Sequence, residues 1–126
     1  MEKLFRLDGK VALVTGASRG LGLAIAQGLA QYGSDVVLVA RDKNRLTAAS
    51  EVVKKTGGRV WPMPFDLQEV EKIPQFFSDV CQVTGGVDIL VNCAGTTYRA
   101  PAEELTLSQW QEVLNLNLTS VLVLCQ

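Results

Sequence analysis

The sequence of 126 residues contains no histidine, the side chain that most often moves protons near neutral pH and binds metals. A histidine-based triad or proton shuttle within this chain is therefore excluded. The three cysteines, Cys81, Cys93 and Cys125, are odd in number and show no C-x-x-C spacing, which argues against a disulfide framework or a zinc site. We expect reduced thiols and no bound metal.

The sequence also lacks an excess of positive charge and any long apolar run. Lys and Arg number 12 against 13 Asp and Glu, a net charge of −1, so no basic stripe is available for nucleic acid. No segment approaches the roughly 18 apolar residues of a membrane span, and residues 1–10 do not resemble a signal peptide. We expect a cytoplasmic protein that binds neither nucleic acid nor a membrane.

Apolar residues are present in the amount that one folded domain needs. They make up 48% of the chain, and charged residues make up 20%. A length of 126 residues falls within the usual range for one domain, about 100–150 residues. We therefore predict a single domain over residues 1–126.

Short apolar runs alternate with segments of helical periodicity along the whole chain. The runs predict strands at 10–15, 34–40, 59–65 and 87–91. Helices are predicted between them, near 21–32, 42–56 and 74–84, with a last one beginning near Leu107. Such βαβ alternation indicates an α/β fold, a Rossmann-type doubly wound parallel sheet covered by helices on both faces.

Two prolines in the third predicted strand help to place it in the sheet. Pro62 and Pro64 are two residues apart, so both missing N–H groups fall on the same side of the strand and leave the other side free to pair. A strand of this kind belongs at a sheet edge. The third strand has that place in the doubly wound order that begins 3-2-1-4.

A glycine-rich segment, Thr15-Gly16-Ala17-Ser18-Arg19-Gly20-Leu21-Gly22, connects the first predicted strand to the first helix. Glycines allow a ligand to approach the backbone closely, and a helix start offers unpaired N–H groups and the positive end of its dipole. The segment therefore suits a pyrophosphate. A tight turn between strand and helix is the alternative, and the spacing differs from the common G-x-G-x-x-G.

Asn92-Cys93-Ala94-Gly95 follows the fourth predicted strand. Together with residues 15–22, it resembles the N-N-A-G and T-G-x-x-x-G-x-G motifs of the short-chain dehydrogenase/reductase family, with cysteine in place of the second asparagine. Asp66-Leu67, Trp110 and Asn117-Leu118 also fall where that family has such residues. Residues 5–10 and 98–101 are most similar to the branch of gluconate 5-dehydrogenases and sugar-acid reductases, and the 3-oxoacyl-carrier-protein reductases are the near alternative.

The resemblance implies a dinucleotide site. The glycines would shape the pyrophosphate loop, Asp66 and Leu67 would hold the adenine, and the segment after the fourth strand would line the adenosine. The cofactor-binding residues expected on this basis are Gly16, Ser18, Arg19, Gly20, Leu21, Gly22, Arg41, Asp66, Leu67, Asn92, Ala94 and Gly95. A helix N-cap is the alternative role for Asp66, and Cys93 is expected to pack as a small apolar side chain.

The end of the second predicted strand favours NADP(H) over NAD(H). Family members that prefer NAD place an acid there to bind the ribose 2′-hydroxyl, whereas a 2′-phosphate needs cationic donors. This sequence has Ala40 at that position, followed by Arg41, and Arg19 stands in the glycine loop. Asp42 nearby is the opposing observation, and two solvated surface arginines are the alternative.

The family's catalytic Tyr and Lys, four residues apart, are absent. The only tyrosines are Tyr32 and Tyr98, and neither has lysine four residues on. Asn117 matches the family's supporting active-site asparagine, with Asn115 as its rival. We expect this chain to be the cofactor half of the fold, cut after Gln126 before the later strands, and inactive alone.

Two functions are compatible with these features. The first is an NADP(H)-dependent oxidoreductase that interconverts a carbonyl and a secondary alcohol, with a keto sugar acid or a 3-oxoacyl compound as substrate. The second is a dinucleotide-binding module without catalysis, with a regulatory or interaction role. The apolar segment 121–125 and an open fourth strand predict a homo-oligomer.

Overall fold

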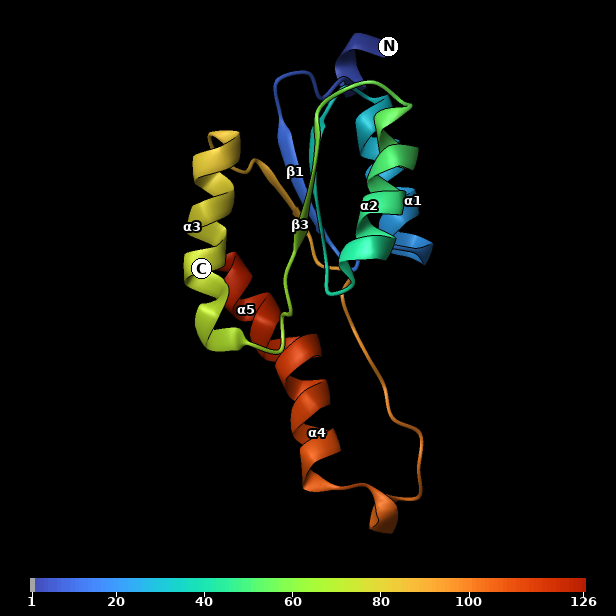
Figure 1. Ribbon diagram of the computed structural model, residues 1–126, viewed down its shortest axis with the longest axis vertical. Coiled ribbons are helices and arrows are strands. Elements are labelled where there is room, and N and C mark those ends of the chain that lie inside the picture. The colour runs from blue at the N-terminus through green and yellow to red at the C-terminus, as the bar shows by residue number, and fades with distance from the viewer. Residues whose placement is uncertain (1) are drawn as a thin grey trace.

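The computed structural model describes residues 2–126 and shows a four-stranded parallel sheet with helices on both faces (Figure 1). The strands are β1 (Val11–Thr15), β2 (Asp35–Ala40), β3 (Val60–Pro64) and β4 (Ile89–Val91). Their order is β3-β2-β1-β4, and every neighbouring pair is parallel. The predicted doubly wound sheet is confirmed, and its order begins 3-2-1-4 as expected.

In the described part of the chain, five α-helices connect and flank these strands: α1 (Gly20–Gln31), α2 (Lys43–Lys54), α3 (Ile73–Thr84), α4 (Leu107–Leu114) and α5 (Ser120–Cys125). Shorter helical segments are the 3-10 helices η1 (Glu2–Phe5), η2 (Val70–Lys72) and η3 (Ala102–Glu104), and the π-helical η4 (Asn115–Thr119). Within the described residues, no helix has the length and apolar character to cross a membrane.

The core lies on both faces of the sheet. On one face, Val14, Val36 and Leu38 pack against Leu46 and Val53 of α2 and the alanines of α1. On the other face, apolar residues of β1 and β2 pack against α3, and α5 lies beside α3 (Figure 1). The two central strands are thus covered on both sides, which explains why their sequences are apolar at nearly every position.

The two prolines of β3 direct their backbone nitrogens away from the neighbouring strand β2. The Val36 N–H donates to the Arg59 carbonyl at 2.9 Å, and the Phe65 N–H donates to the Ala40 carbonyl at 3.0 Å. Because alternate residues of a strand hydrogen-bond on opposite sides, Pro62 and Pro64 direct their nitrogen atoms outward. The predicted edge position of this strand is confirmed.

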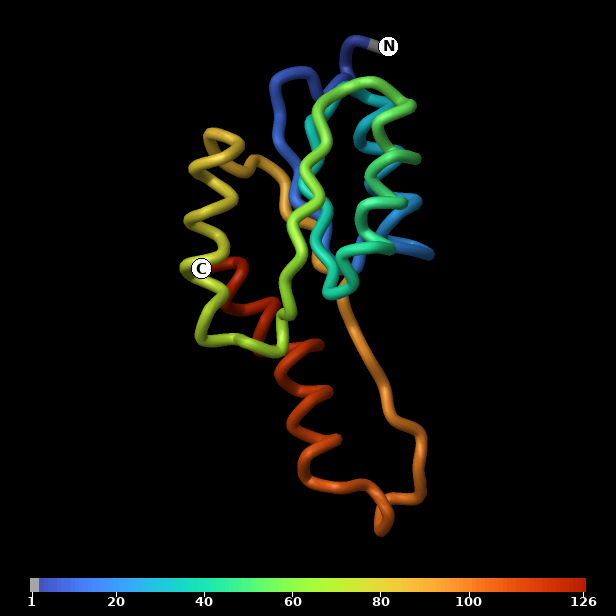
Figure 2. Tube along the Cα trace, in the orientation of Figure 1, coloured from blue at the N-terminus to red at the C-terminus, as the bar shows by residue number. Residues whose placement is uncertain are grey.

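The chain leaves the sheet after β4 and returns through α4. Figure 2 shows the segment that follows β4 running away from the sheet before α4 leads back toward it. Thr106 starts α4 with a capping box: its hydroxyl accepts from the Gln109 N–H, and the Gln109 side chain accepts from the Thr106 N–H, both at 3.1 Å. The predicted helix start near Leu107 is confirmed, whereas the π-helical break at η4 was not predicted.

Glu112 of α4 connects this helix to two other segments. The Tyr98 hydroxyl, in the loop after β4, donates to the Glu112 carboxylate at 2.5 Å. The Gln68 side-chain amide, in the loop after β3, donates to the Glu112 carbonyl at 2.9 Å. The hydrogen bond to Glu112 raises the pKa of Tyr98 above its ordinary value, and nearby Arg41 opposes this effect.

We predict that Glu112→Gln lowers the pKa of Tyr98 toward the ordinary value of 10.0. The hydrogen bond to Glu112 stabilises the protonated phenol of Tyr98 in the folded chain, and this is why its pKa is raised. The bond's contribution to stability is therefore complete below the ordinary tyrosine pKa and lost as the pH rises through the raised value. Phenolate absorbance, followed through an alkaline titration in a Tyr32→Phe background, measures Tyr98 alone.

Glu103→Gln is the matched control, because this exposed carboxylate lies on η3 and is not among the groups that shift the pKa of Tyr98. The control should leave the titration midpoint of Tyr98 unchanged. An identical midpoint in the Glu112→Gln and parent proteins would contradict the bond.

Candidate functional site

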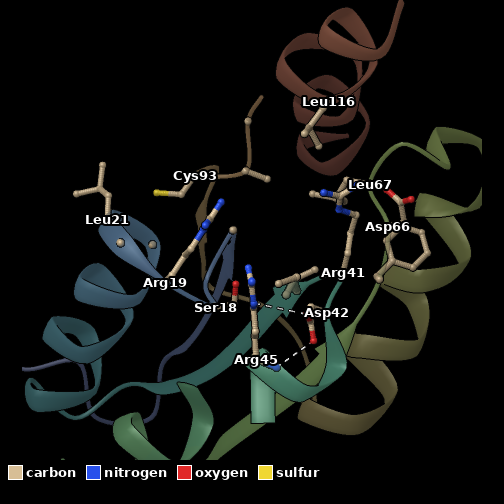
Figure 3. Close-up of a pocket in the computed structure, with 18 of the residues that line it drawn as sticks. Ser18, Arg19, Leu21, Arg41, Asp42, Arg45, Asp66, Leu67, Cys93 and Leu116 are labelled. Carbon is tan, nitrogen blue, oxygen red and sulfur yellow. Dashed lines mark hydrogen bonds and ion pairs between the residues drawn. The ribbon is translucent and has the colours of Figure 1, made fainter. Parts of the chain in front are cut away.

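A cleft of about 770 Å³ opens at the carboxyl ends of the strands. It is lined by the glycine loop, the end of β2, the start of α2 and the segments that follow β3 and β4 (Figure 3). Ligands of doubly wound sheets bind at this edge, where neighbouring loops separate. Eleven of the twelve residues predicted to bind the cofactor line the cleft: Gly16, Ser18, Arg19, Gly20, Leu21, Gly22, Arg41, Asp66, Leu67, Ala94 and Gly95.

At two positions of the loop, close backbone contacts leave no room for a side chain, so only glycine fits. A Cβ on Gly22 would stand 2.2 Å from the Gly16 carbonyl oxygen, and one on Gly16 would stand 2.9 Å from the Ala94 nitrogen. Gly16 also has a φ of +60°, which favours glycine. The loop therefore folds tightly against both α1 and the segment after β4.

Gly20 has a different environment from these two glycines. Its φ is +58°, and apart from its chain neighbours and the backbone of α1, no atom lies within 4 Å of the position that a Cβ would occupy. Arg19, at the N-cap of α1, makes no side-chain capping bond, and no acidic residue lies in the first turn of the helix. The N-terminus of α1 thus presents uncapped N–H groups and a positive dipole end beside the cleft, an arrangement that attracts a phosphate.

The hydroxyl of Thr15 joins the glycine loop to the segment after β4. It accepts hydrogen bonds from the N–H groups of Cys93 and Ala94, both at 3.0 Å, and lies 3.4 Å from the Val91 carbonyl, to which it donates. Thr15 is buried. The first residue of one motif therefore fixes the position of the other, and the Ala17 N–H ties the loop to the Val39 carbonyl at 3.2 Å.

Asp66 lines the cleft and also shapes the turn after β3. One of its carboxylate oxygens accepts from the Gln68 N–H at 2.9 Å. Glu69 and Lys72, not Asp66, hold the N-cap positions of η2 and α3, so the alternative role of helix cap is wrong. Leu67 is buried, lines the cleft and packs with Ile73 and Leu124.

Asn92 is the predicted cofactor residue that does not line the cleft. Its side-chain amide lies 3.8 Å from the sulfur of Cys125, on α5. Strand alternation explains the difference, because successive side chains after β4 point to opposite faces of the sheet. The expected contact of this side chain with the cofactor is not supported by the geometry.

Asn117 lies in the π-helical segment η4 and holds the loop after β4. Its side-chain oxygen accepts from the Thr96 N–H at 2.9 Å, and its side-chain nitrogen donates to the Thr96 carbonyl at 2.8 Å. Asn115, the rival candidate, instead accepts from the side chain of Gln111 on its own helix at 2.8 Å. Of the two, only Asn117 reaches the strand end that borders the cleft.

The cleft contains three arginines, Arg19, Arg41 and Arg45, and two aspartates, Asp42 and Asp66. Figure 3 shows the arginines extending from the glycine loop, the end of β2 and the first turn of α2. Sequence reasoning missed Arg45 because it belongs to none of the motifs. The available signal was its place three residues after Asp42, the N-cap of α2, which keeps it at the end of the helix that faces the cleft.

Comparison with known proteins agrees with this architecture. The family model for short chain dehydrogenases matches residues 10–126. Gluconate 5-dehydrogenase from Gluconobacter oxydans is 38% identical over 118 residues, which cover 94% of this chain and 46% of the relative. A 3-oxoacyl-[acyl-carrier-protein] reductase from Aquifex aeolicus is 38% identical over 122 residues, 96% of this chain and 49% of the relative.

The solved structures give the same result. L-sorbose reductase from Gluconobacter frateurii, crystallised with NADPH and L-sorbose, superposes with a TM-score of 0.90 at 38% identity. The superposition covers 96% of this chain and 46% of that protein. The chain thus spans about half the length of the relatives that it matches. On the family match, the sequence identities and the shared sheet order, the chain belongs to the short-chain dehydrogenase/reductase family of oxidoreductases.

Proposed function

We propose that the protein is an NADP(H)-dependent oxidoreductase that interconverts a carbonyl and a secondary alcohol, and that these 126 residues supply its dinucleotide site. The observation that carries the proposal is the cleft, in which an uncapped helix N-terminus and three arginines lie together. The complex of L-sorbose reductase with NADPH supports the choice of cofactor.

The residues of the cleft fit the parts of a dinucleotide. The open backbone at Gly20 and the start of α1 would hold the pyrophosphate. The Asp66 carboxylate would accept from the adenine amino group, with Leu67 as an apolar wall. Ala94 and Gly95 would line the adenosine side, where small residues leave room for the ligand.

Arg19 and Arg41 are proposed to bind the 2′-phosphate of NADP(H). They stand at the end of the glycine loop and the end of β2, and both line the cleft. A guanidinium offers paired donors and keeps its charge at any physiological pH. Ala40 leaves no acid at the position from which NAD-preferring members bind the ribose, which favours the phosphorylated cofactor.

The nicotinamide, when bound, supplies or accepts the hydride. The described residues bind and orient the dinucleotide, and Asn117 is proposed as a positioning residue that fixes the loop bordering the reacting end through Thr96. The tyrosine–lysine pair that the family uses for proton transfer is not among the 126 residues. We therefore propose that the chain alone binds NADP(H) without turnover.

A keto sugar acid or a 3-oxoacyl thioester is the proposed substrate, on the basis of the relatives alone. We further propose that the protein works in the cytoplasm as a homo-oligomer. The exposed side chains of Leu107, Trp110, Leu118 and Leu122 support the second point, because large apolar groups on one helical arm favour association.

Titration with the two cofactors tests the proposed preference. We expect NADPH to bind about tenfold or more tightly than NADH, since each charge-assisted hydrogen bond to the 2′-phosphate contributes roughly 1.5–3 kcal/mol. The quenching or enhancement of cofactor fluorescence gives both dissociation constants. NADH bound as tightly as NADPH would overturn the preference.

Gly22→Ala tests the site through the glycine loop. The added methyl group would lie 2.2 Å from the Gly16 carbonyl oxygen, so we expect a loss of about 1–3 kcal/mol in the free energy of unfolding together with weaker NADPH binding. Urea denaturation and cofactor titration measure the two effects.

Gly28→Ala is the matched control on the same helix, because its added methyl group would have no atom within 4 Å apart from its chain neighbours and the backbone of its own helix. This variant should be more stable by about 0.5–1 kcal/mol and bind NADPH as before. Equal behaviour of the two variants would refute the role given to the loop.

The reaction is tested in the protein encoded by the whole reading frame. A frame that continues past Gln126 into a Y-x-x-x-K motif and yields NADPH-dependent reduction of 5-ketogluconate or a β-ketoacyl thioester supports the proposal. Activity on the thioester alone would remove the sugar-acid substrate. A stop codon after Gln126, with NADPH binding but no turnover, would favour the non-catalytic dinucleotide module.

A further inference from the structure

Arg45 lines the cleft from helix α2, whereas Arg19 belongs to the glycine loop and Arg41 follows β2. Arg45 is the third residue of α2 and lines the same cleft as Arg19 and Arg41 (Figure 3). Its side chain is 64% exposed, so it is available to a ligand in the cleft. None of the sequence motifs that identify the family includes this position.

Asp42 fixes the position of Arg45 in two ways. One carboxylate oxygen of Asp42 accepts from the Arg45 backbone N–H at 3.1 Å and thereby caps α2. The other oxygen lies 3.6 Å from Nε of the Arg45 side chain. Among the described residues, the terminal nitrogens Nη1 and Nη2 of Arg45 have no hydrogen-bonding partner, so their donors remain available.

The pairing changes what Asp42 does in the cleft. A free carboxylate near the end of β2 would accept from a ribose 2′-hydroxyl and repel a 2′-phosphate. Here the carboxylate is occupied by the helix cap and faces a cation of its own. The Arg45 guanidinium therefore counters the charge of Asp42. This pairing reduces the repulsion between Asp42 and a 2′-phosphate, which was the observation in the sequence that opposed NADP(H).

We infer that the Asp42–Arg45 pair is a determinant of cofactor choice, in which Arg45 donates to the 2′-phosphate and also neutralises the acid beside it. The inference rests on the proposed NADP(H) function and names a residue of that site beyond Arg19 and Arg41. An exposed ion pair such as Asp42–Arg45 contributes little to the free energy of unfolding. We therefore expect its effect on ligand binding rather than on stability.

Two small ligands isolate the 2′-phosphate. Adenosine 2′,5′-bisphosphate and AMP differ only in that group, so the ratio of their dissociation constants, measured by calorimetry, reports on its binding alone. Arg45→Ala should weaken binding of the bisphosphate by about fivefold to tenfold, as expected for the loss of one exposed charge-assisted contact, and leave AMP binding unchanged.

Lys43→Ala is the matched control. It removes one positive charge from the same first turn of α2, but Lys43 does not line the cleft. The control should leave the ligand ratio unchanged. An equal change in both variants would show a long-range effect of charge and overturn the role given to Arg45.

Asp42→Asn tests the other half of the pair. Asparagine caps helices about as well as aspartate, so α2 should persist while the negative charge is lost. We expect tighter binding of the bisphosphate and a smaller penalty for Arg45→Ala in this background. An unchanged penalty would overturn the neutralising role of Arg45.

Binding of the two ligands to the unmodified protein distinguishes failure of the proposed NADP(H) function from failure of the inference about Arg45. If it binds the bisphosphate no better than AMP, the proposed NADP(H) function itself fails. If it prefers the bisphosphate but Arg45→Ala behaves like the parent, only the inference about Arg45 fails. Thermal unfolding of each variant confirms that the compared proteins are folded.

Discussion

The buried hydroxyl of Thr15 is the interaction on which the cleft depends. This hydroxyl accepts hydrogen bonds from the N–H groups of two consecutive residues after β4, and Thr15 is itself the last residue of β1. Buried N–H groups without partners would cost free energy, so this one side chain both satisfies and positions them. The glycine loop and the adenosine-side segment, 78 residues apart along the chain, thus form one wall, and Gly16 and Ala94 lie too close together for a side chain at residue 16.

The sequence predicted most of the fold because its signals are local. Apolar runs, helix stops and the spacing of Pro62 and Pro64 each reflect a constraint that acts within a few residues. Together with the known strand order of doubly wound sheets, they predicted the order of all four strands. The bounds of the elements differ by a residue or two, as helix and strand ends commonly do. Most of the lining of the cleft was predicted from the resemblance to the family's motifs, whose residues lie in loops after parallel strands that meet at one edge.

The remaining features depend on contacts between distant segments. Arg45 reaches the cleft because the Asp42 cap orients the start of α2, and no motif records that geometry. Asn92 turns toward Cys125 because the chain alternates after β4. The π-helical turn at η4 places Asn117 against Thr96, an arrangement that depends on tertiary contact. Helical periodicity alone could not predict this break in the last helix.

The prolines of β3 have a consequence for how the sheet can grow. Their nitrogens face outward and carry no hydrogen, so an incoming strand would find donors missing at two positions of this edge. The opposite edge, at β4, has no proline along Ile89–Val91, so each of these residues keeps its backbone N–H. Addition of a strand, whether from the same polypeptide or from another molecule, is therefore directional: the edge at β3 is protected, and the edge at β4 accepts.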